Sequence, residues 1–387
     1  MNWKKKFVRN WGRLGMKCKL SDICVFRKGK VDVSKLTLKT YISTENMLPN
    51  KGGVTEASSL PTVQLTQEYK KGDILVSNIR PYFKKIWQAK CDGGCSNDVL
   101  VFQGNSNIDG DFLYYILAND DFFAYSMATS KGTKMPRGDK TSIMQYEVPI
   151  FDIDTQRKIA SVLRSLDEKI ELNSTINNNL EQQAQTIYQQ MFIDNARSDW
   201  AEGTLSDIAD ITMGQSPSGS SYNEDGTGTI FFQGRAEFGF RFPSVRLYTT
   251  EPKRMARSND TLMSVRAPVG DLNVAHMDCC IGRGLAAIHS KSHHQSFVLY
   301  TMFSLKKQLD VFNGEGTVFG SINRNSLNDM PIFIPPDDIL DEFERIVAPM
   351  DLTIRNNYDE NCRLQDIRDT LLPRLMSGEL DVSDIDL

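Results

Sequence analysis

The chain has 387 residues, of which 40% are hydrophobic and 24% charged, a composition typical of a globular protein with two or three domains. No apolar run approaches the roughly 18 residues that a membrane helix needs, so a membrane protein is not expected. The net charge of −4 and the isoelectric point of about 5.7 argue against a freestanding basic DNA-binding domain. Any basic surface must therefore be local, or a partner must supply part of the grip on DNA phosphates.

Residues 1–17 are predicted to form a basic N-terminal arm, either solvated or in contact with DNA. No apolar segment follows this arm, so it is not interpreted as a secretory signal. The chain also contains seven cysteines, an odd number that does not suggest a disulfide framework. The cysteines therefore favour a reducing, cytoplasmic location.

The sequence repeats itself at an offset of about 185 residues. Leu20-Ser21-Asp22-Ile23 recurs as Leu205-Ser206-Asp207-Ile208. Residues 72–80 resemble residues 258–266, and Lys131-Gly132-Thr133 resembles Glu315-Gly316-Thr317. Units of this length are too long for a solenoid repeat, so we expect a duplicated domain with a connector and internal pseudo-twofold symmetry.

The first domain is predicted to span residues 18–153 and to have an α+β fold. Short β-type runs occur at residues 74–79 and 98–102, and residues 112–117 have a helical pattern. Residues 147–151 are expected to be an edge strand or an extended exit, because a proline cannot donate to a β-ladder.

Two loops of this domain concentrate cations. Arginine pairs with guanine edges and lysine mostly holds phosphates, so these loops are predicted to contact DNA. For each side chain, an ordinary surface or structural role is the alternative. The candidates are Arg80, Tyr82, Lys84, Lys85, Lys134, Arg137 and Lys140.

Residues 154–197 are predicted to form a long spacer helix. Its apolar residues and two central asparagines step alternately by four and three, which is the heptad spacing of a coiled-coil seam. The seam residues are Ile159, Leu163, Leu166, Ile170, Asn173, Asn177, Leu180 and Ile187.

The second domain is predicted to span residues 198–336 and to repeat the first. Its β-type runs lie at residues 261–265 and 284–288, its helix lies at residues 297–303, and residues 214–228 are expected to form a loop. Amides pair with adenine edges, so amides join the arginines as candidates. The predicted DNA-contacting residues are Gln215, Gln233, Arg235, Arg266, Arg283, Asn323 and Arg324.

Arg80 and Arg266 are interpreted as sharing one position of the repeat. This favours a shared contact with the DNA backbone, or a role in folding, over base reading, because base readers should differ between the halves of a target.

A second spacer helix is predicted for residues 337–380, followed by a short tail at residues 381–387. Adding 184 to the first seam gives Phe343, Val347, Met350, Ile354, Asn357, Asn361, Leu364 and Leu371. The matching seams predict that the two helices pair antiparallel, with the asparagines fixing the register; the alternative is that both helices are simply polar in the middle. A helix of about 35 residues is roughly 50 Å long, which suits a spacer between two domains. Pro349 is interpreted as a possible late start of the second helix.

Three stretches of the chain resemble type I restriction-modification specificity subunits. Gly132-Thr133, followed by residues 147–150 and 154–160, is similar to the junction between a target-recognition domain and a spacer helix in that family. Residues 371–380 resemble the end of its second helix, and residues 213–217 resemble an early signature of its recognition domains. The resemblance covers residues 18–380.

The resemblance implies a non-catalytic DNA-binding subunit whose two recognition domains read the halves of a bipartite, asymmetric target. It also implies double-stranded DNA, two methyltransferase subunits and motor-nuclease subunits as partners. S-adenosylmethionine would be bound by the methyltransferase subunits, so no cofactor is expected in this chain.

The sequence lacks an adenine methyltransferase motif and a P-loop, and it predicts no metal site. Four histidines lie between His276 and His294, but the adjacent Cys279 and Cys280 do not suit the usual zinc spacing. The alternatives to a specificity subunit are a stand-alone (orphan) DNA-binding protein, a nuclease in its own right and a coiled-coil interaction protein.

Overall fold

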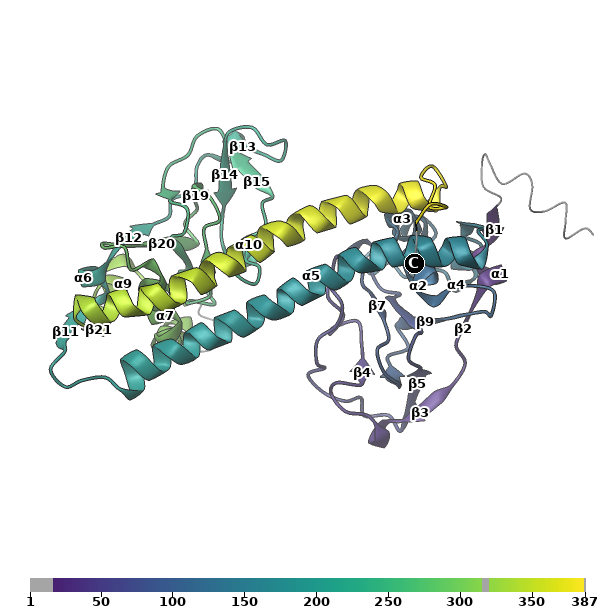
Figure 1. Cartoon of the computed structure of the whole chain (residues 1–387), viewed down its shortest axis with the longest axis horizontal. Coiled ribbons are helices and arrows are strands. Elements are labelled where there is room, and N and C mark those ends of the chain that lie inside the picture. The colour runs from purple at the N-terminus through teal and green to yellow at the C-terminus, as the bar shows by residue number, and fades with distance from the viewer. Residues whose placement is uncertain (1–16, 315–319, 386–387) are drawn as a thin grey trace, which may run out of the picture. The chain divides into compact units, whose positions relative to one another are not determined.

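The structure is a computed structural model that describes residues 17–314 and 320–385. The chain divides into two compact units, residues 1–172 with 360–387, and residues 173–359 (Figure 1). Most of the predicted basic arm, and the predicted repeat at Glu315-Gly316-Thr317, lie outside the described residues.

The first unit is built on an antiparallel four-stranded sheet. Its strand order is β2 (Cys24–Phe26), β9 (Val99–Gly104), β6 (Ile74–Ser77) and β7 (Ile86–Gln88). A second four-stranded sheet has the order β3 (Lys30–Asp32), β5 (Leu65–Tyr69), β8 (Gly93–Cys95) and β4 (Tyr41–Ile42). One pair, β1 (Lys17–Lys19) with β10 (Glu147–Pro149), joins the start of the domain to its end.

Two helices share the main core of this unit with the first sheet. They are α2 (Gly110–Ala118) and α3 (Asp120–Ala128), and each begins where an Asp or Asn side chain accepts bonds from the first backbone N–H groups. Phe112 and Phe122 are fully buried in one cluster with Ile74, Phe102 and Leu163. The predicted strands and the predicted helix of the first domain thus form one layered α+β core.

The second unit repeats this arrangement. Its four-stranded sheet has the order β12 (Ala209–Met213), β20 (Leu285–Ser290), β17 (Thr261–Ser264) and β18 (Leu272–Val274). The pair β11 (Ala201–Thr204) with β21 (Pro331–Ile334) matches β1 with β10, and α7 (Gln295–Ser304) follows β20 as α2 follows β9. The matching strand order confirms two similar α+β domains in one chain.

The second sheet of this unit differs from that of the first. It has five strands, in the order β13 (Tyr222–Asn223), β15 (Leu247–Thr249), β14 (Thr229–Phe232), β19 (Cys279–Ile281) and β16 (Met255–Ala256). The duplicated domains have therefore diverged in this sheet while keeping the four-stranded one.

Two long helices, α5 (Ile153–Tyr188) and α10 (Asp337–Met376), follow the two domains in the chain. Within the second unit, Asn177 donates to the carbonyl of Ile354, and the ring of Tyr188 lies 5.9 Å from that of Phe343. A later residue of α5 thus contacts an earlier residue of α10, so the two helices run antiparallel, as predicted.

Helix α10 begins well before Pro349, so the interpretation of Pro349 as a late helix start was wrong. Tertiary packing of the apolar seam outweighs the loss of one backbone hydrogen bond at each internal proline. None of the helices in the described ranges combines the length and apolar character required to cross a membrane.

Candidate nucleic-acid interface

The structure brings the two basic loops of the first domain together. Ile79 and Arg137 form an isolated β-bridge, and the backbone N–H of Arg80 donates to the carbonyl of Pro136 at 2.8 Å. Residues 78–85 and 130–140 therefore form one surface beyond the end of β6, which we call the first loop surface. Arg80 itself is partly buried, and its backbone is left-handed with a φ of 50°.

A third loop, missed by the sequence reasoning, joins this surface. Asn50 and Lys51 donate backbone hydrogen bonds to the carbonyls of Phe83 and Lys84 at 2.8 and 2.9 Å. The ammonium of Lys85 donates to the carbonyl of Thr44 at 2.6 Å, and its burial lowers its pKa. The turn-forming residues 50–53 marked a loop, but no sequence pattern placed it beside Phe83.

Acidic side chains hold several cations of the first loop surface. Lys84 and Lys51 lie 2.7 and 3.0 Å from Asp120; burial alone would raise the pKa of that carboxyl, but the two lysines hold it below its ordinary value. Lys131 donates to Asp139 and, with the N–H of Ser142, lowers the pKa of Asp139 to about 2. A DNA phosphate would have to replace these carboxylates.

The same surface presents apolar side chains to solvent. Tyr82, Phe83 and Met135 are 49%, 38% and 46% exposed. The rings of Tyr82 and Phe83 are 4.7 Å apart, and the ammonium of Lys85 lies over Phe83. Cations interleaved with aromatic rings suit both the charged backbone and the flat bases of a nucleic acid.

The remaining predicted cations of the first domain are exposed. Arg137 pairs with Asp98 at 3.2 Å, and the ammonium of Lys140 lies 6.0 Å from the ring of Phe26. Lys134 forms no side-chain hydrogen bond or ion pair with the described part of the chain.

Glycines position the equivalent loops of the second domain. A Cβ on Gly214 would lie 2.1 Å from the carbonyl oxygen of Gly282, and a Cβ on Gly282 would lie 2.9 Å from Gln233. Only glycine permits this approach, which places Gln215, Gln233 and Arg283 on one edge of the unit. Their three side chains are exposed.

Arg266, Asn323 and Arg324 extend this edge, which we call the second loop surface. Arg266 bridges to Ser321, and Ile322 donates to the carbonyl of Val265 at 3.1 Å. The side chain of Asn323 caps α9 (Arg324–Asn328) by accepting from Ser326, so its first role is structural. The side chains of Gln215, Gln233, Arg266, Arg283 and Arg324 form no hydrogen bond or ion pair among the described residues.

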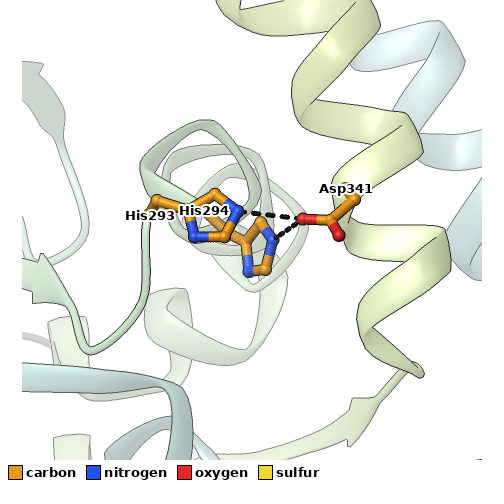
Figure 2. Close-up of side chains that lie close together, drawn as sticks. All are labelled: His293, His294 and Asp341. Carbon is orange, nitrogen blue, oxygen red and sulfur yellow. Dashed lines mark hydrogen bonds and ion pairs between the residues drawn. The ribbon is translucent and has the colours of Figure 1, made fainter.

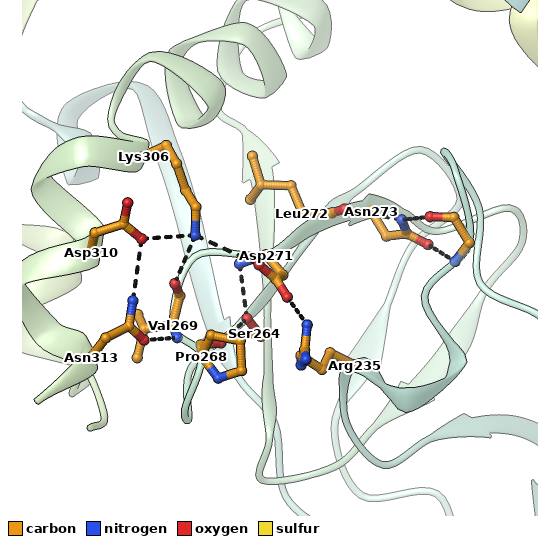
Figure 3. Close-up of polar contacts among 11 residues, drawn as sticks. Arg235, Ser264, Pro268, Val269, Asp271, Leu272, Asn273, Lys306, Asp310 and Asn313 are labelled. Atoms are coloured by element: carbon orange, nitrogen blue, oxygen red, sulfur yellow. Dashed lines mark hydrogen bonds and ion pairs between the residues drawn. The ribbon is translucent and has the colours of Figure 1, made fainter. Parts of the chain in front are cut away.

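Arg235 belongs to a polar network at the turn between β17 and β18 (Figure 3). Its guanidinium pairs with Asp271, which also lies 3.6 Å from the ammonium of Lys306. The hydroxyl of Ser264 holds the turn by donating to the carbonyl of Pro268 at 2.7 Å. The network fixes the turn and leaves Arg235 less free to contact DNA than Gln215 or Arg283.

The strand register corrects the proposed equivalence of Arg80 and Arg266. Ser77 pairs with Val99 at the end of β6, and Ser264 pairs with Leu285 at the end of β17. Arg80 is the third residue after its serine, whereas Arg266 is the second. The sequence alignment was displaced by one residue, so the two arginines do not share a position.

The predicted seam residues of the two helices are all buried or partly buried. In the second unit, the Asn357 side chain donates to that of Asn177 at 2.8 Å. In the first unit, the Asn361 side chain donates to the carbonyl of Ile170 at 3.5 Å. The asparagines thus use both side-chain and backbone partners.

Each domain contacts its helix segment through a tyrosine–aspartate hydrogen bond that the sequence analysis missed. Tyr115 of α2 donates to Asp167 of α5 at 2.7 Å, and Tyr300 of α7 donates to Asp351 of α10 at 2.9 Å. The aspartates differ by 184 and the tyrosines by 185, so the bond is duplicated with the domain. The two tyrosines and the two aspartates lie at matching positions of the sequence repeat, but they are not part of its apolar seam.

Different arginines complete the two networks. Arg368 of α10 pairs with Asp167 at 2.7 Å, whereas Arg241 comes from a loop of the second domain. Arg241 is only 4% exposed and lies 2.9 Å from Glu181 of α5 and 3.2 Å from Asp351. Burial raises the pKa of Glu181, although Arg241 opposes that effect.

Comparisons with known proteins agree with this architecture. A family profile described as the type I restriction modification DNA specificity domain matches residues 15–182 and again residues 197–357, which together exceed half of the chain. The chain belongs to this family of type I specificity subunits.

Two curated relatives are specificity subunits. A Methanocaldococcus jannaschii protein named as the MjaX type I restriction enzyme specificity subunit is 29% identical over 310 residues. The match covers 74% of this chain and 72% of that protein. The HindI specificity subunit of Haemophilus influenzae is 24% identical over 93% of this chain and 98% of its own length. These relatives favour a specificity subunit over the stand-alone DNA-binding protein and the nuclease.

A solved structure of the same class supports the fold. The crystal structure of a type I restriction-modification S subunit from M. genitalium covers 95% of this chain and 97% of its own, with a TM-score of 0.60 and 16% identity. At that identity the likeness speaks for the fold alone. The family to which this chain belongs is a family of DNA-specificity subunits, not of catalytic subunits.

Proposed function

We propose that this specificity subunit reads a bipartite, asymmetric DNA target, one half with each loop surface. The proposal rests on one observation. The four-stranded sheets of the two domains have the same strand order, but the loops at the same end of each sheet present different side chains. Residues 78–85 follow β6 with two lysines and two aromatic rings, whereas the equivalent residues 265–272 after β17 contain neither lysine nor aromatic ring. The second loop surface presents Gln215, Gln233 and Arg283 instead. Different readers at equivalent places imply half-sites of different sequence.

Within each surface we assign roles by side-chain chemistry. Lys134 and Lys140 hold phosphates on the first surface, because an ammonium carries charge but little base information. Lys84 and Lys85 join them after leaving Asp120 and the carbonyl of Thr44. Tyr82 and Arg137 are its candidate base-contacting residues, although Arg137 must first leave Asp98, and Arg80 shapes the turn.

On the second surface, Gln215 and Gln233 suit adenine edges and Arg283 suits guanine. Arg266 and Arg324 are available to the DNA backbone. Arg235 reaches DNA only by leaving Asp271, and Asn323 only by giving up its helix cap.

The helices α5 and α10 act as the spacer that sets the gap between the half-sites. They contain 36 and 40 residues, which correspond to about 54 and 60 Å of α-helix. Their mutually packed seams make them stiffer than a flexible linker.

The subunit also serves as a scaffold for two methyltransferase subunits, which bind S-adenosylmethionine, and for motor-nuclease subunits. The net charge of −4 supports such partners, because this chain alone brings little excess positive charge to DNA. Its seven cysteines are all free thiols, which suits a reducing cytoplasm.

The test is to co-express the chain with its neighbouring methyltransferase subunit and to map N6-methyladenine across the host genome. We expect a split, non-palindromic motif, and no motif when either subunit is expressed alone. Deletion of residues 200–335 should abolish methylation of the split motif. A continuous wild-type motif, or methylation that survives the deletion unchanged, would contradict the proposal.

A further inference from the structure

Two adjacent histidines at the N-terminus of α7 face one carboxylate of α10 (Figure 2). Nε2 of His293 and Nε2 of His294 each lie 2.9 Å from Oδ1 of Asp341. One ligand atom from each of the three residues falls within 4.8 Å of the others. All three residues belong to the second unit, and none of them is part of its loop surface.

The surroundings hold this cluster in place before any ion binds. The His294 side chain is 4% exposed, and its Nδ1 lies 2.9 Å from the hydroxyl of Ser292. A serine hydroxyl can donate or accept, so it can partner Nδ1 when Nε2 binds a proton and equally when Nε2 binds a metal. Metal-binding histidines typically use their second nitrogen in this way.

The cluster is also accessible and has the required charge. The side chains of His293 and Asp341 are 76% and 59% exposed, so an ion and completing waters can reach it. Asp341 supplies the acidic side chain of the cluster, and its Oδ1 lies 2.9 Å from the Nε2 atom of each histidine. Glu344, one turn further along α10, already accepts from the N–H of Phe297.

Two imidazole nitrogens and a carboxylate oxygen are a donor set suited to Zn²⁺. Tetrahedral Zn²⁺ with bonds of about 2.0 Å separates its ligand atoms by about 3.3 Å, so the 2.9 Å contacts here need only a small expansion. We propose that His293, His294 and Asp341 bind Zn²⁺ or a similar divalent transition-metal ion, with water completing the coordination.

The bound ion would link the segment before α7 to the second turn of α10. It would therefore stabilise the second unit and take no part in base reading. The sequence alone does not indicate this site, because Asp341 lies 47 residues after His294, well outside any local ligand motif.

The test uses the full-length chain after treatment with a chelator. Zn²⁺ is titrated by calorimetry, and Co²⁺ is titrated while its visible absorption is recorded. We expect one ion per chain, tetrahedral Co²⁺ bands and a higher melting temperature with Zn²⁺. His293→Ala, whose side chain is exposed, and Asp341→Asn should each weaken binding by at least about tenfold.

His276→Gln is the matched control, because His276 lies 2.6 Å from Asp359 in a histidine–aspartate pair outside this cluster. That variant should bind Zn²⁺ as the wild type does. The proposal is overturned if the wild-type chain shows no saturable site, or if His293→Ala and Asp341→Asn bind as tightly as the wild type. Loss of binding in His276→Gln alone would also overturn it.

Discussion

At the scale of single residues, two kinds of polar side chain on the loop surfaces can be compared. Some form an ion pair with an aspartate, and others form no ion pair or hydrogen bond within the described part of the chain. Lys84 and Arg235 belong to the first kind, since they pair with Asp120 and Asp271. Lys134 and Gln215 are exposed and belong to the second kind within the described part of the chain. The second kind can bind DNA without first losing a partner, so it should carry the larger effects on binding.

Lys134→Ala and Gln215→Ala should therefore change DNA binding in different ways. In the assembled methyltransferase, Lys134→Ala should weaken binding to all sequences and reduce the slope of log K against log salt by about 1. Gln215→Ala should instead cost about 1–3 kcal/mol on the cognate target and relax one base position. Fluorescence anisotropy with cognate and single-mismatch duplexes at several salt concentrations measures both, and interchangeable effects would refute the roles assigned.

Burial also predicts which cysteines react. It raises the pKa of Cys24, Cys95 and Cys279 to about 12, so almost no thiolate is present at pH 8. Cys91 is exposed and should react first with a disulfide reagent. The buried three should react only after denaturation, and Cys91→Ser should remove a fast phase; rapid labelling of any buried thiol in the native protein would contradict this ordering.

At the scale of elements, Arg241 links a loop of the second domain to both helix segments of that unit. Replacing it with alanine would leave Glu181 and Asp351 without their cation in a largely buried environment. We expect Arg241→Ala to lower the free energy of unfolding by about 3–5 kcal/mol. The exposed pair of Arg235 with Asp271 provides the control, since Arg235→Ala should cost at most about 1 kcal/mol.

Urea unfolding followed by circular dichroism and tryptophan fluorescence measures both variants. Similar, small losses for the two variants would show that the buried network contributes little. A double variant that also replaces Glu181 with glutamine should recover part of the loss, because it removes one of the stranded charges.

At the scale of the whole molecule, the helix lengths should set the gap between half-sites. One heptad of seven residues inserted at facing positions, after Asn177 and after Ile354, keeps the seam in register and lengthens each helix by about 10.5 Å. The gap should then grow by about three base pairs, given a rise of about 3.4 Å per pair. A seven-residue insertion after Asp225, in an exposed tip, should leave it unchanged, as methylation mapping would show; an unaltered gap in the helix variant would rule out the spacer role.

The sequence was sufficient to predict the duplicated domains and the antiparallel helices, because apolar periodicity and self-similarity act over long, regular stretches. It placed Gln215, Gln233 and Arg283 in loops but did not predict that glycine contacts bring them together. Contacts such as Lys51 with Asp120 depend on loop geometry that no periodic pattern encodes. The displaced alignment of Arg80 with Arg266 shows the same limit, since only hydrogen-bond register fixes a one-residue shift.

The central claim is that each domain reads its own half of the target. The most direct measurement maps N6-methyladenine motifs for two variants, one with Tyr82→Ala and Arg137→Ala, the other with Gln215→Ala and Gln233→Ala. Each variant should relax bases in one half-site only, in opposite halves, with the gap unchanged. Changes in both halves from one variant, or in the same half from both, would contradict the claim.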